Sequence, residues 1–275
     1  MRPQTQELRN NLLKLEDALE RLKTLKDQYK GETAYILGAG PSLNNYSHEF
    51  LREFMSDKLC MTIKQVYNIL KEQTDFHIMN FCNFAPYDWS GNKSIVSWII
   101  FEQYHPEMIF KNKLASDLMV PLFRNTPWTG GIEGPNKLSR SICEMEDWDT
   151  MLLDDPTTSF NQPWGPGIMY ELAMPLALYL GCTKIVTVGW DIGDLSKFQN
   201  DLSDHTQREW QDHFYGAEGK GKVVYAPQKM GPREILSVAN STKSLYYWLK
   251  DRNVEWEMVS DRNPGYENIP RIELK

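Results

Sequence analysis

The amino-acid sequence predicts an α/β protein with a mostly parallel sheet that helices cover on both faces. Three observations support this fold class. Short apolar runs recur along the chain with helical stretches between them, the pattern of parallel strands buried on both sides. A glycine-rich strand-to-helix turn follows the first run, within residues 33–43. An apolar helical segment over residues 168–180 leads into the most regular strand pattern of the chain.

Each element can be placed from its residue pattern. The apolar runs predict strands over residues 33–37, 58–63, 75–81, 94–101, 184–191, 223–225 and 254–259. The helical periods predict helices over residues 48–55, 65–71, 168–180, 204–213 and 235–250. Pro175 lies inside the apolar helix, so we expect it to kink that helix or to mark its effective start.

The first 31 residues are expected to form an N-terminal helix ahead of a main domain over residues 32–275. Five leucines in the helical stretch 5–30 alternate spacings of four and three residues, namely Leu8, Leu12, Leu15, Leu19 and Leu22. This is the seam of a coiled coil. Two interpretations stay open: the helix docks on its own domain, or it pairs with the same helix of another subunit in a homo-oligomer.

An insertion over residues 102–163 interrupts the main domain. It holds six prolines and three glycines and shows little period. A stretch of this length without regular elements often forms a lid or a substrate loop. The alternative is an insertion that takes no part in catalysis.

Composition narrows the function classes. The 275 residues suffice for one large domain, and the net charge of −7 argues against a general nucleic-acid binder. The four cysteines are widely spaced, which favours reduced thiols and a cytoplasmic protein. The charged first thirty residues do not resemble a signal peptide, and no apolar run reaches the roughly 18 residues of a membrane span.

The turn after the first strand predicts a phosphate site. Gly38 and Gly40 let backbone amides approach a ligand, and the helix start beyond Pro41 and Ser42 offers further N–H groups and a partial positive charge. An ordinary tight turn is the alternative. The dinucleotide fingerprint is incomplete because Leu43 occupies the third glycine position, and no Gly-Lys-Ser/Thr of a P-loop follows.

Other candidate binding residues follow strand ends, where parallel sheets bind ligands, or a second glycine turn. They are Lys64, Gln65, Asn80, Asn83, Pro166, Gly167, Gly189 and Asp191. We expect asparagine and glutamine to contact a base or ribose. Asp191 and Asp194 are the candidate ligands for Mg²⁺ against a diphosphate, although Asp191 equally suits ribose hydroxyls or a helix cap.

The candidate general bases are His205, His213 and Glu234. The two histidines are spaced close to two helical turns and share a face of the expected helix there. A solvated helix face is the alternative. The chain contains no Gly-x-Ser-x-Gly elbow and no His-Glu-x-x-His motif, so nothing supports a serine hydrolase or a zinc peptidase.

Residues 36–43, Ile-Leu-Gly-Ala-Gly-Pro-Ser-Leu, resemble an opening motif shared by two related groups. One is the bacterial lipo-oligosaccharide sialyltransferases. The other is the motility-associated glycosyltransferases together with the archaeal hydroxymethylpterin diphosphokinase-like proteins. A second similarity covers Gly165-Pro-Gly, the apolar helix to Leu180-Gly181 and the strand ending Gly189-Trp-Asp. Together the similarities span roughly residues 33–83 and 164–192.

The resemblance implies a Rossmann-like nucleotide-binding domain with a lid, which transfers a sugar from a nucleotide-sugar donor to a hydroxyl acceptor. By the same resemblance, the donor pocket is lined by Gly38, Gly40, Pro41, Ser42, Asn80, Pro166, Gly167, Gly189 and Asp191. One alternative is an ATP-dependent diphosphokinase of the hydroxymethylpterin type, with Mg²⁺ on Asp191 and Asp194.

The chain departs from the sialyltransferase pattern at several positions. Ala39 stands where those enzymes have asparagine, Ile192 and Gly193 follow Asp191 where tyrosines are expected, and no histidine precedes the last helix. These differences argue against sialyl transfer in particular. They keep a non-catalytic nucleotide-binding protein as the second alternative.

Overall fold

The computed structural model describes residues 1–16, 18–63, 66–80, 91, 93–101, 119–124, 169, 173–191, 242–243, 245–260, 263 and 265–275. The strands are β1 (Thr33–Leu37), β2 (Leu59–Ile63), β3 (Phe76–Asn80), β4 (Ile95–Phe101), β5 (Met119–Arg124), β6 (Lys184–Val188) and β7 (Glu255–Val259). The helices are α1 (Pro3–Leu12), α2 (Ala18–Thr24), the 3₁₀ helix η1 (Pro41–Asn45), α3 (His48–Phe54), α4 (Tyr67–Leu70) and α8 (Met174–Tyr179). Residues 245–251, just before β7, are also helical.

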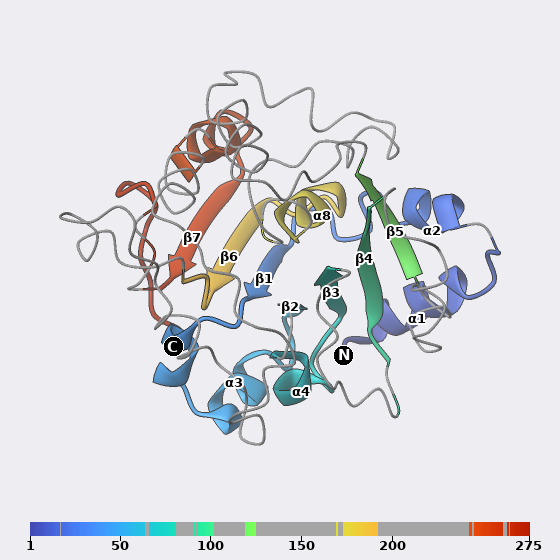
Figure 1. Ribbon diagram of the computed structural model, residues 1–275, viewed down its shortest axis with the longest axis horizontal. Coiled ribbons are helices and arrows are strands. Elements are labelled where there is room, and N and C mark those ends of the chain that lie inside the picture. The colour runs from blue at the N-terminus through green and yellow to red at the C-terminus, as the bar shows by residue number, and fades with distance from the viewer. Residues whose placement is uncertain are drawn as a thin grey trace.

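The strands form one parallel sheet in the order β5-β4-β3-β2-β1-β6-β7 (Figure 1). From β1 the chain builds outward on one side through β2, β3, β4 and β5, and then continues on the other side with β6 and β7. The order therefore reverses between β1 and β6, which makes this pair the topological switch point. The predicted α/β class with a Rossmann-like parallel sheet is confirmed.

Strand β5 corrects the prediction for the insertion over residues 102–163. Its six residues lie inside that segment, where no regular element was expected. Pro121 explains the error, because proline lacks the N–H that a central strand needs. The sheet tolerates Pro121 because β5 is the edge strand of the described sheet and pairs there with β4.

The α-helical part of this segment, α8, begins at Met174 with Pro175 in its first turn, one of the two expected outcomes, while Ala173 just before it is π-helical. A proline is tolerated there because first-turn N–H groups have no partner within the helix. Gly181 follows the helix with a φ of +86°, and the Cys182 N–H returns to the Ala177 carbonyl oxygen at 3.1 Å. The expected end at Gly181 is thus observed.

The N-terminal segment forms two helices where the sequence predicted one, because the chain ends α1 at Leu12 and restarts by Ala18. Leu8, Leu12 and Leu22 are buried in the same hydrophobic core as the sheet. Heptad spacing gives the same seam whether the leucines face another subunit or the parent domain. Here the segment folds back on itself and docks on its own domain; pairing between subunits stays a prediction.

Backbone hydrogen bonds fasten this segment to the end of α8. The N–H groups of Asp27, Tyr29 and Gly31 donate to the carbonyl oxygens of Tyr179, Leu180 and Gly181 at 3.0, 2.8 and 2.9 Å. Carbonyls at a helix end need partners from outside the helix, and the N-terminal segment supplies them here. The first 31 residues are therefore part of the domain's packing.

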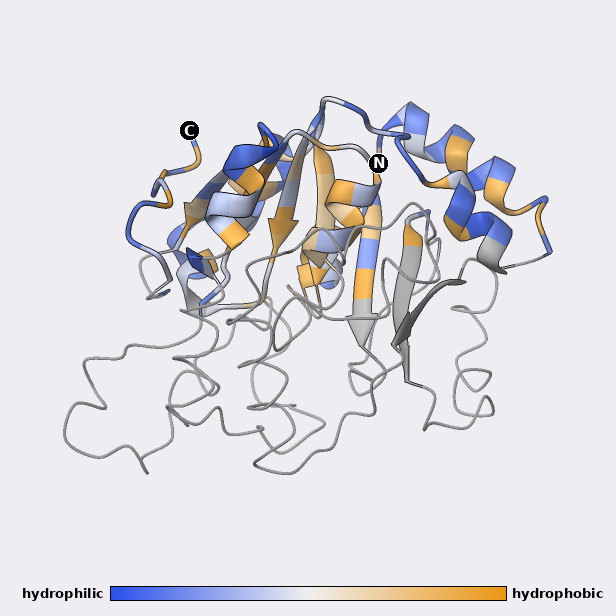
Figure 2. Cartoon of the chain, turned by 90° about the horizontal axis from the view of Figure 1, so that it is seen from above, coloured by the Kyte–Doolittle hydropathy of each residue, from blue (hydrophilic) through white to orange (hydrophobic). Residues whose placement is uncertain are grey.

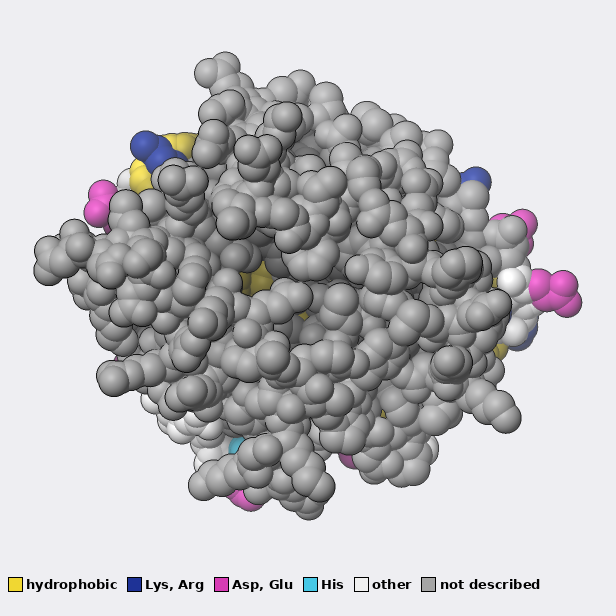
Figure 3. Space-filling view, viewed as in Figure 1, with side chains coloured by type: hydrophobic (Ala, Val, Ile, Leu, Met, Phe, Trp, Pro, Cys, Tyr) yellow, Lys and Arg dark blue, Asp and Glu magenta, His cyan; other side chains and the backbone are white. Residues whose placement is uncertain are grey.

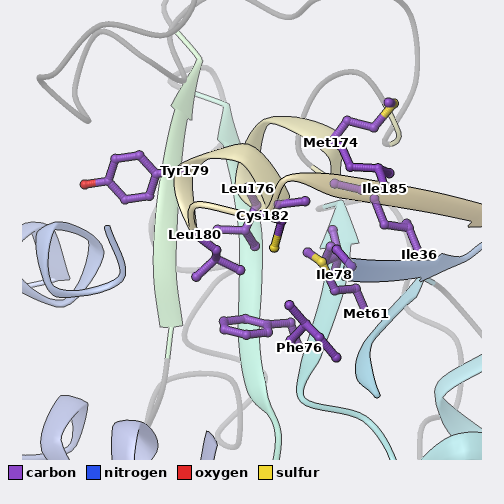
Figure 4. Close-up of a cluster of buried hydrophobic side chains, with 14 of the residues drawn as sticks. Ile36, Met61, Phe76, Ile78, Met174, Leu176, Tyr179, Leu180, Cys182 and Ile185 are labelled. Carbon is purple, nitrogen blue, oxygen red and sulfur yellow. The ribbon is translucent and has the colours of Figure 1, made fainter. Parts of the chain in front are cut away.

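The hydrophobic core has a layer on each face of the sheet. On one face, side chains of α8 gather against those of β1, β2, β3 and β6, with Leu176, Phe76 and Ile185 fully buried (Figure 4). On the other face, α3, α4 and the C-terminal residues enclose a second cluster that includes Leu51 and Val188. The outward sides of α1 and α2 are hydrophilic (Figure 2). Among the described residues, no helix is both long and apolar enough to cross a bilayer.

Candidate functional site

The turns after β1, β6 and β7 are hydrogen-bonded to one another in series at the switch point. The Gly38 N–H donates to the Val188 carbonyl oxygen at 2.7 Å, and the Gly40 N–H to the Gly189 carbonyl oxygen at 2.8 Å. The Gly189 N–H in turn donates to the Val259 carbonyl oxygen at 3.1 Å. Residues 38–42 and 189–191 therefore lie side by side at the carboxyl edge of the sheet, the edge where the parallel strands end.

The close approach of these turns explains their glycines. A Cβ added to Gly38 would lie 2.8 Å from the Gly189 carbonyl oxygen, and one added to Gly40 would lie 2.5 Å from it. Gly189 has a φ of +64°, and its Cβ would lie 2.6 Å from the Gly38 carbonyl oxygen. Distances below 3.0 Å to backbone atoms cannot be relieved by a side-chain rotation. The two turns are thus in contact backbone to backbone, and substitution of Gly40 perturbs the fold as well as any ligand site.

Asp191 links the three strand ends through its carboxylate. Its Oδ2 accepts a hydrogen bond from the Ser42 N–H at 2.6 Å, and its Oδ1 accepts one from the Ser42 hydroxyl at 2.7 Å. The Ser260 hydroxyl, just after β7, also donates to Oδ1. Hydrogen bonds to an ionised carboxylate are about twice as strong as neutral ones. We call Gly38, Gly40, Ser42, Gly189, Asp191 and Ser260 the Asp191 junction.

The carboxylate of Asp191 lies at the N-terminal end of η1, the position where the sequence predicts a phosphate. The carboxylate accepts the Ser42 N–H at that helix end, where a negative charge is favourable. The N–H groups of Gly38, Gly40 and Ser42 all donate within the protein, so these three amides are not the open donors that the glycine pattern suggested. Asp191 with its two serine hydroxyls instead suits ligand hydroxyl groups, which both donate and accept hydrogen bonds.

Asp191 fits a metal less well than the sequence suggested. An ionised carboxylate offers about four lone-pair positions, and three protein donors already use Asp191. Among the described residues, no group of three or more His, Cys, Asp or Glu side chains is placed to hold a metal ion. Asp194, the other expected ligand, lies outside those residues, so the Mg²⁺ site stays a prediction.

Two more of the predicted binding residues can be placed by their backbone. Pro41 is the first residue of η1, and Asn80 is the last residue of β3, so both lie at the carboxyl edge. The remaining candidates fall outside the described residues: Lys64, Gln65, Asn83, Pro166, Gly167, Asp194, His205, His213 and Glu234. Their binding and catalytic roles stay predictions.

Sequence reasoning missed two polar residues, Ser260 within the junction and Asn263 beside it. The buried Asn263 donates from Nδ2 to the Trp190 carbonyl oxygen at 2.7 Å, and its Oδ1 accepts the Gly265 N–H at 2.8 Å. Ser260 directly follows a predicted strand, so the rule that flagged Asp191 would also have flagged Ser260. Asn263 lies beyond that strand end in a loop, and no spacing rule identifies it.

Buried ionisable groups also occur at the opposite edge of the sheet. Asp75 precedes β3 and accepts hydrogen bonds from the Cys60 N–H at 3.0 Å and from the Thr5 hydroxyl; burial raises its pKa. His77 lies inside β3, and its Nδ1 is 3.0 Å from the Thr62 hydroxyl oxygen. Burial lowers the pKa of His77 to about 3. These groups have a structural role, and they lie at the edge of the sheet opposite the Asp191 junction.

Charged side chains link strands β6 and β7 at the surface. Lys184 at the start of β6 places Nζ 2.7 Å from Glu257 and 3.4 Å from Glu255 on the neighbouring strand. On the face drawn in Figure 3, the visible charged side chains of the described residues lie near the outer margin.

Burial raises the pKa of the Cys182 thiol to about 12 and raises that of Cys60 as well, so neither is a reactive thiolate at neutral pH.

Comparison with known proteins gives a fold likeness alone. No family model matches the chain, and no curated protein matches its sequence. Among solved structures, it is similar to the MAf glycosyltransferase from Magnetospirillum magneticum AMB-1, with a TM-score of 0.51 and 13% sequence identity. The match covers 98% of this chain and 38% of that one. The chain thus has a glycosyltransferase-like fold and spans well under half the length of this neighbour.

Proposed function

We propose that the chain is a nucleotide-dependent transferase of the glycosyltransferase kind, which moves a sugar from a nucleotide-sugar donor to a hydroxyl of an acceptor. One observation carries the proposal: the Asp191 junction presents a carboxylate and two serine hydroxyls at the switch point, where open parallel sheets bind their ligands. The fold likeness to a protein named as a glycosyltransferase supports it.

We propose that the ribose and the phosphate of the donor bind to two different sets of groups. In our proposal Asp191 accepts a hydrogen bond from one hydroxyl of the donor's ribose, while Ser42 and Ser260 fix the orientation of the carboxylate. The backbone N–H groups of Gly38, Gly40 and Ser42 already donate hydrogen bonds to protein acceptors. In our proposal the phosphate of the nucleotide-sugar therefore binds elsewhere. The second glycine turn, residues 165–167, is the proposed place for it.

The chemistry of the transfer then follows from the donor. The bond between the sugar's anomeric carbon and the phosphate oxygen breaks, and the nucleotide leaves with the bonding electrons. The acceptor oxygen forms the new bond to that carbon, and its proton passes to a general base. His205, His213 and Glu234 are the proposed candidates for that base. Asp191 binds and orients the donor and makes no bond to the transferred sugar.

Titration calorimetry with CMP, UDP, GDP and ADP, each as the ribo and the 2′-deoxy form, tests ligand binding. We expect one ribonucleotide to bind about tenfold more tightly than its deoxy form, because one hydrogen bond to a charged group is lost. Asp191→Asn should weaken the binding of that ribonucleotide and remove the difference in affinity between the ribo and deoxy forms. Asp57→Asn is the matched control, since the Asp57 side chain is 79% exposed. Equal binding of both forms, or no binding at all, would contradict the proposal.

Turnover separates the remaining alternatives. Release of free sugar from the nucleotide-sugar whose nucleotide binds, without added metal, supports sugar transfer. Strict dependence on Mg²⁺ with release of AMP from ATP would instead support the diphosphokinase, against which the three protein donors on Asp191 weigh. Nucleotide binding without turnover, in the presence of candidate acceptors, would support a non-catalytic binding protein.

A further inference from the structure

Three tyrosine side chains form a cluster beside the end of β7. Tyr246 and Tyr247 lie on the helix before β7, and Tyr266 lies in the loop after it. The three ring centroids are 5.5 to 5.7 Å apart, and the hydroxyl oxygens of Tyr247 and Tyr266 are 2.6 Å apart. Tyr247 is 45% exposed, the largest exposed fraction for a large hydrophobic side chain among the described residues. We call this cluster the tyrosine platform.

The backbone under the platform is fixed by buried polar groups. The Tyr266 N–H donates to the hydroxyl of the fully buried Thr242 at 2.8 Å. The guanidinium of Arg271 donates to the carbonyl oxygens of Ile269, Asn263 and Gly265 at 2.7, 3.2 and 3.3 Å. A loop held at this many points keeps its exposed rings in place, so a ligand that binds there loses little free energy to ordering the loop.

The platform lies at the same edge of the sheet as the Asp191 junction. Asn263 opens the loop that carries Tyr266, and its side chain binds the carbonyl oxygen of Trp190, the residue before Asp191. Asn263 also accepts the N–H of Gly265, the residue before Tyr266, so hydrogen bonds and chain neighbours connect Asp191 with Tyr266. An acceptor bound on the platform would extend along this edge toward the junction.

We propose that the tyrosine platform is a carbohydrate-binding subsite that holds the acceptor of the transferase. A sugar ring is amphipathic, with a C–H face and a rim of hydroxyls, and a tyrosine likewise has an apolar ring and a polar end. Around the rings lie hydrogen-bonding groups of both kinds: the two phenol hydroxyls, the Asn268 amide that donates to the Tyr266 hydroxyl, and the Lys243 ammonium 5.6 Å from the Tyr266 ring centroid. The choice of a carbohydrate acceptor rests on the proposed transferase function.

The size of the platform argues against a protein partner. A stable protein interface buries about 800 Å² on each side. A fully buried aromatic side chain contributes about 150–250 Å². Among the aromatic side chains of the described residues, Tyr247 alone is more than one-third exposed. One exposed ring with a partly exposed neighbour matches one or two sugar rings much better.

Saturation-transfer-difference NMR with lactose, maltose and chitobiose tests the subsite on the full chain. We expect ring C–H signals of at least one disaccharide to receive saturation from the protein. Tyr247→Ala should raise its dissociation constant about tenfold, equivalent to about 1.4 kcal/mol, within the range for stacking on an aromatic side chain. Tyr247→Phe keeps the ring and should retain most of the binding. Leu13→Ala, at a 42% exposed leucine on the N-terminal segment, is the matched control and should not change it.

The outcomes separate this subsite from the function on which it rests. Absence of saturation transfer to all three disaccharides, or unchanged binding by Tyr247→Ala with an unchanged melting temperature, overturns the subsite. Loss of nucleotide binding in Tyr247→Ala would mean that a nucleobase stacks there, and a change in molar mass by light scattering would mean that a second copy docks there; each overturns it too. Sugar binding that depends on Tyr247 in a chain that binds no nucleotide would leave the carbohydrate site standing and refute the transferase.

Discussion

Replacing Gly40 with alanine tests whether the β1 and β6 turns are in direct contact. The φ and ψ of Gly40, −74° and 156°, are open to any residue, so the backbone conformation itself costs nothing. The new Cβ, however, would lie 2.5 Å from both the Gly189 carbonyl oxygen and the Asp191 Oδ2. Separating these atoms by the roughly 1 Å required would strain the turns and lengthen the two hydrogen bonds between Ser42 and Asp191.

The magnitude follows from these two effects. Overpacking costs about 1–3 kcal/mol, and a hydrogen bond to a charged group contributes about 1.5–3 kcal/mol. We expect the free energy of unfolding of Gly40→Ala to fall by about 3 kcal/mol. Gly31→Ala is the control for backbone conformation alone, because Gly31 has a φ of +81° and its Cβ would meet no atom within 4 Å. The left-handed conformation should cost that variant about 1 kcal/mol.

Urea unfolding followed by circular dichroism measures both variants against the parent chain. A Gly40→Ala protein as stable as Gly31→Ala would refute the contact between the turns, and with it the structural explanation of the glycines. The double variant Gly40→Ala/Asp191→Ala adds a second criterion. Because removing the carboxylate relieves one of the two close contacts, its loss of stability should be smaller than the sum of the single losses.

Three further predictions concern the rest of the fold. Leu12→Ala should lower the free energy of unfolding by about 2–5 kcal/mol because Leu12 is fully buried, whereas its neighbour Leu13, 42% exposed, should tolerate alanine; a change in oligomer mass without loss of stability would favour the coiled coil instead. Ser47→Ala should cost about 1 kcal/mol in urea unfolding because the Ser47 hydroxyl caps α3, and an unchanged midpoint would contradict this. Burial lowers the pKa of His77 to about 3, so the folded chain binds fewer protons than the unfolded one, and stability should fall on the order of 5 kcal/mol as pH drops from 6.5 to 3. The raised pKa of Asp75 acts in the opposite direction above pH 3.8, so the difference between the curves of the parent and His77→Gln isolates the histidine; parallel curves would refute this cause.

The sequence was a good guide where local pattern decides the structure. Strand β1 spans the predicted residues 33–37, and the predicted strands at 58–63 and 254–259 were each one residue too long at the start. Parallel strands buried on both faces are near-continuous apolar runs, so their composition alone identifies them. The predicted end of α8 at Gly181 was also local, since a glycine at that position favours the left-handed turn.

Other features depend on contacts between distant residues, which no local pattern contains. The leucine seam predicted a helical surface but not what covers it, so one long helix was predicted where two form. The glycine spacing predicted a tight turn but not that Asp191, 149 residues after Ser42, would supply the negative charge at that turn. Strand β5 was missed because Pro121 is acceptable only in an edge strand, and position within a sheet is a property of the whole fold.

The position of Asp191 changes what the glycine motif implies about ligands. A helix end with open amides selects for a phosphate, whereas the same helix end neutralised by a carboxylate repels one. In the function proposed above, the junction recognises a ligand through its hydroxyl groups, and the phosphate binds to a different part of the edge. A nucleotide-sugar can satisfy both requirements at once, because its ribose and its phosphate are covalently linked in one molecule. Free phosphate cannot, so we infer that it competes poorly for the junction even if a nucleotide binds tightly.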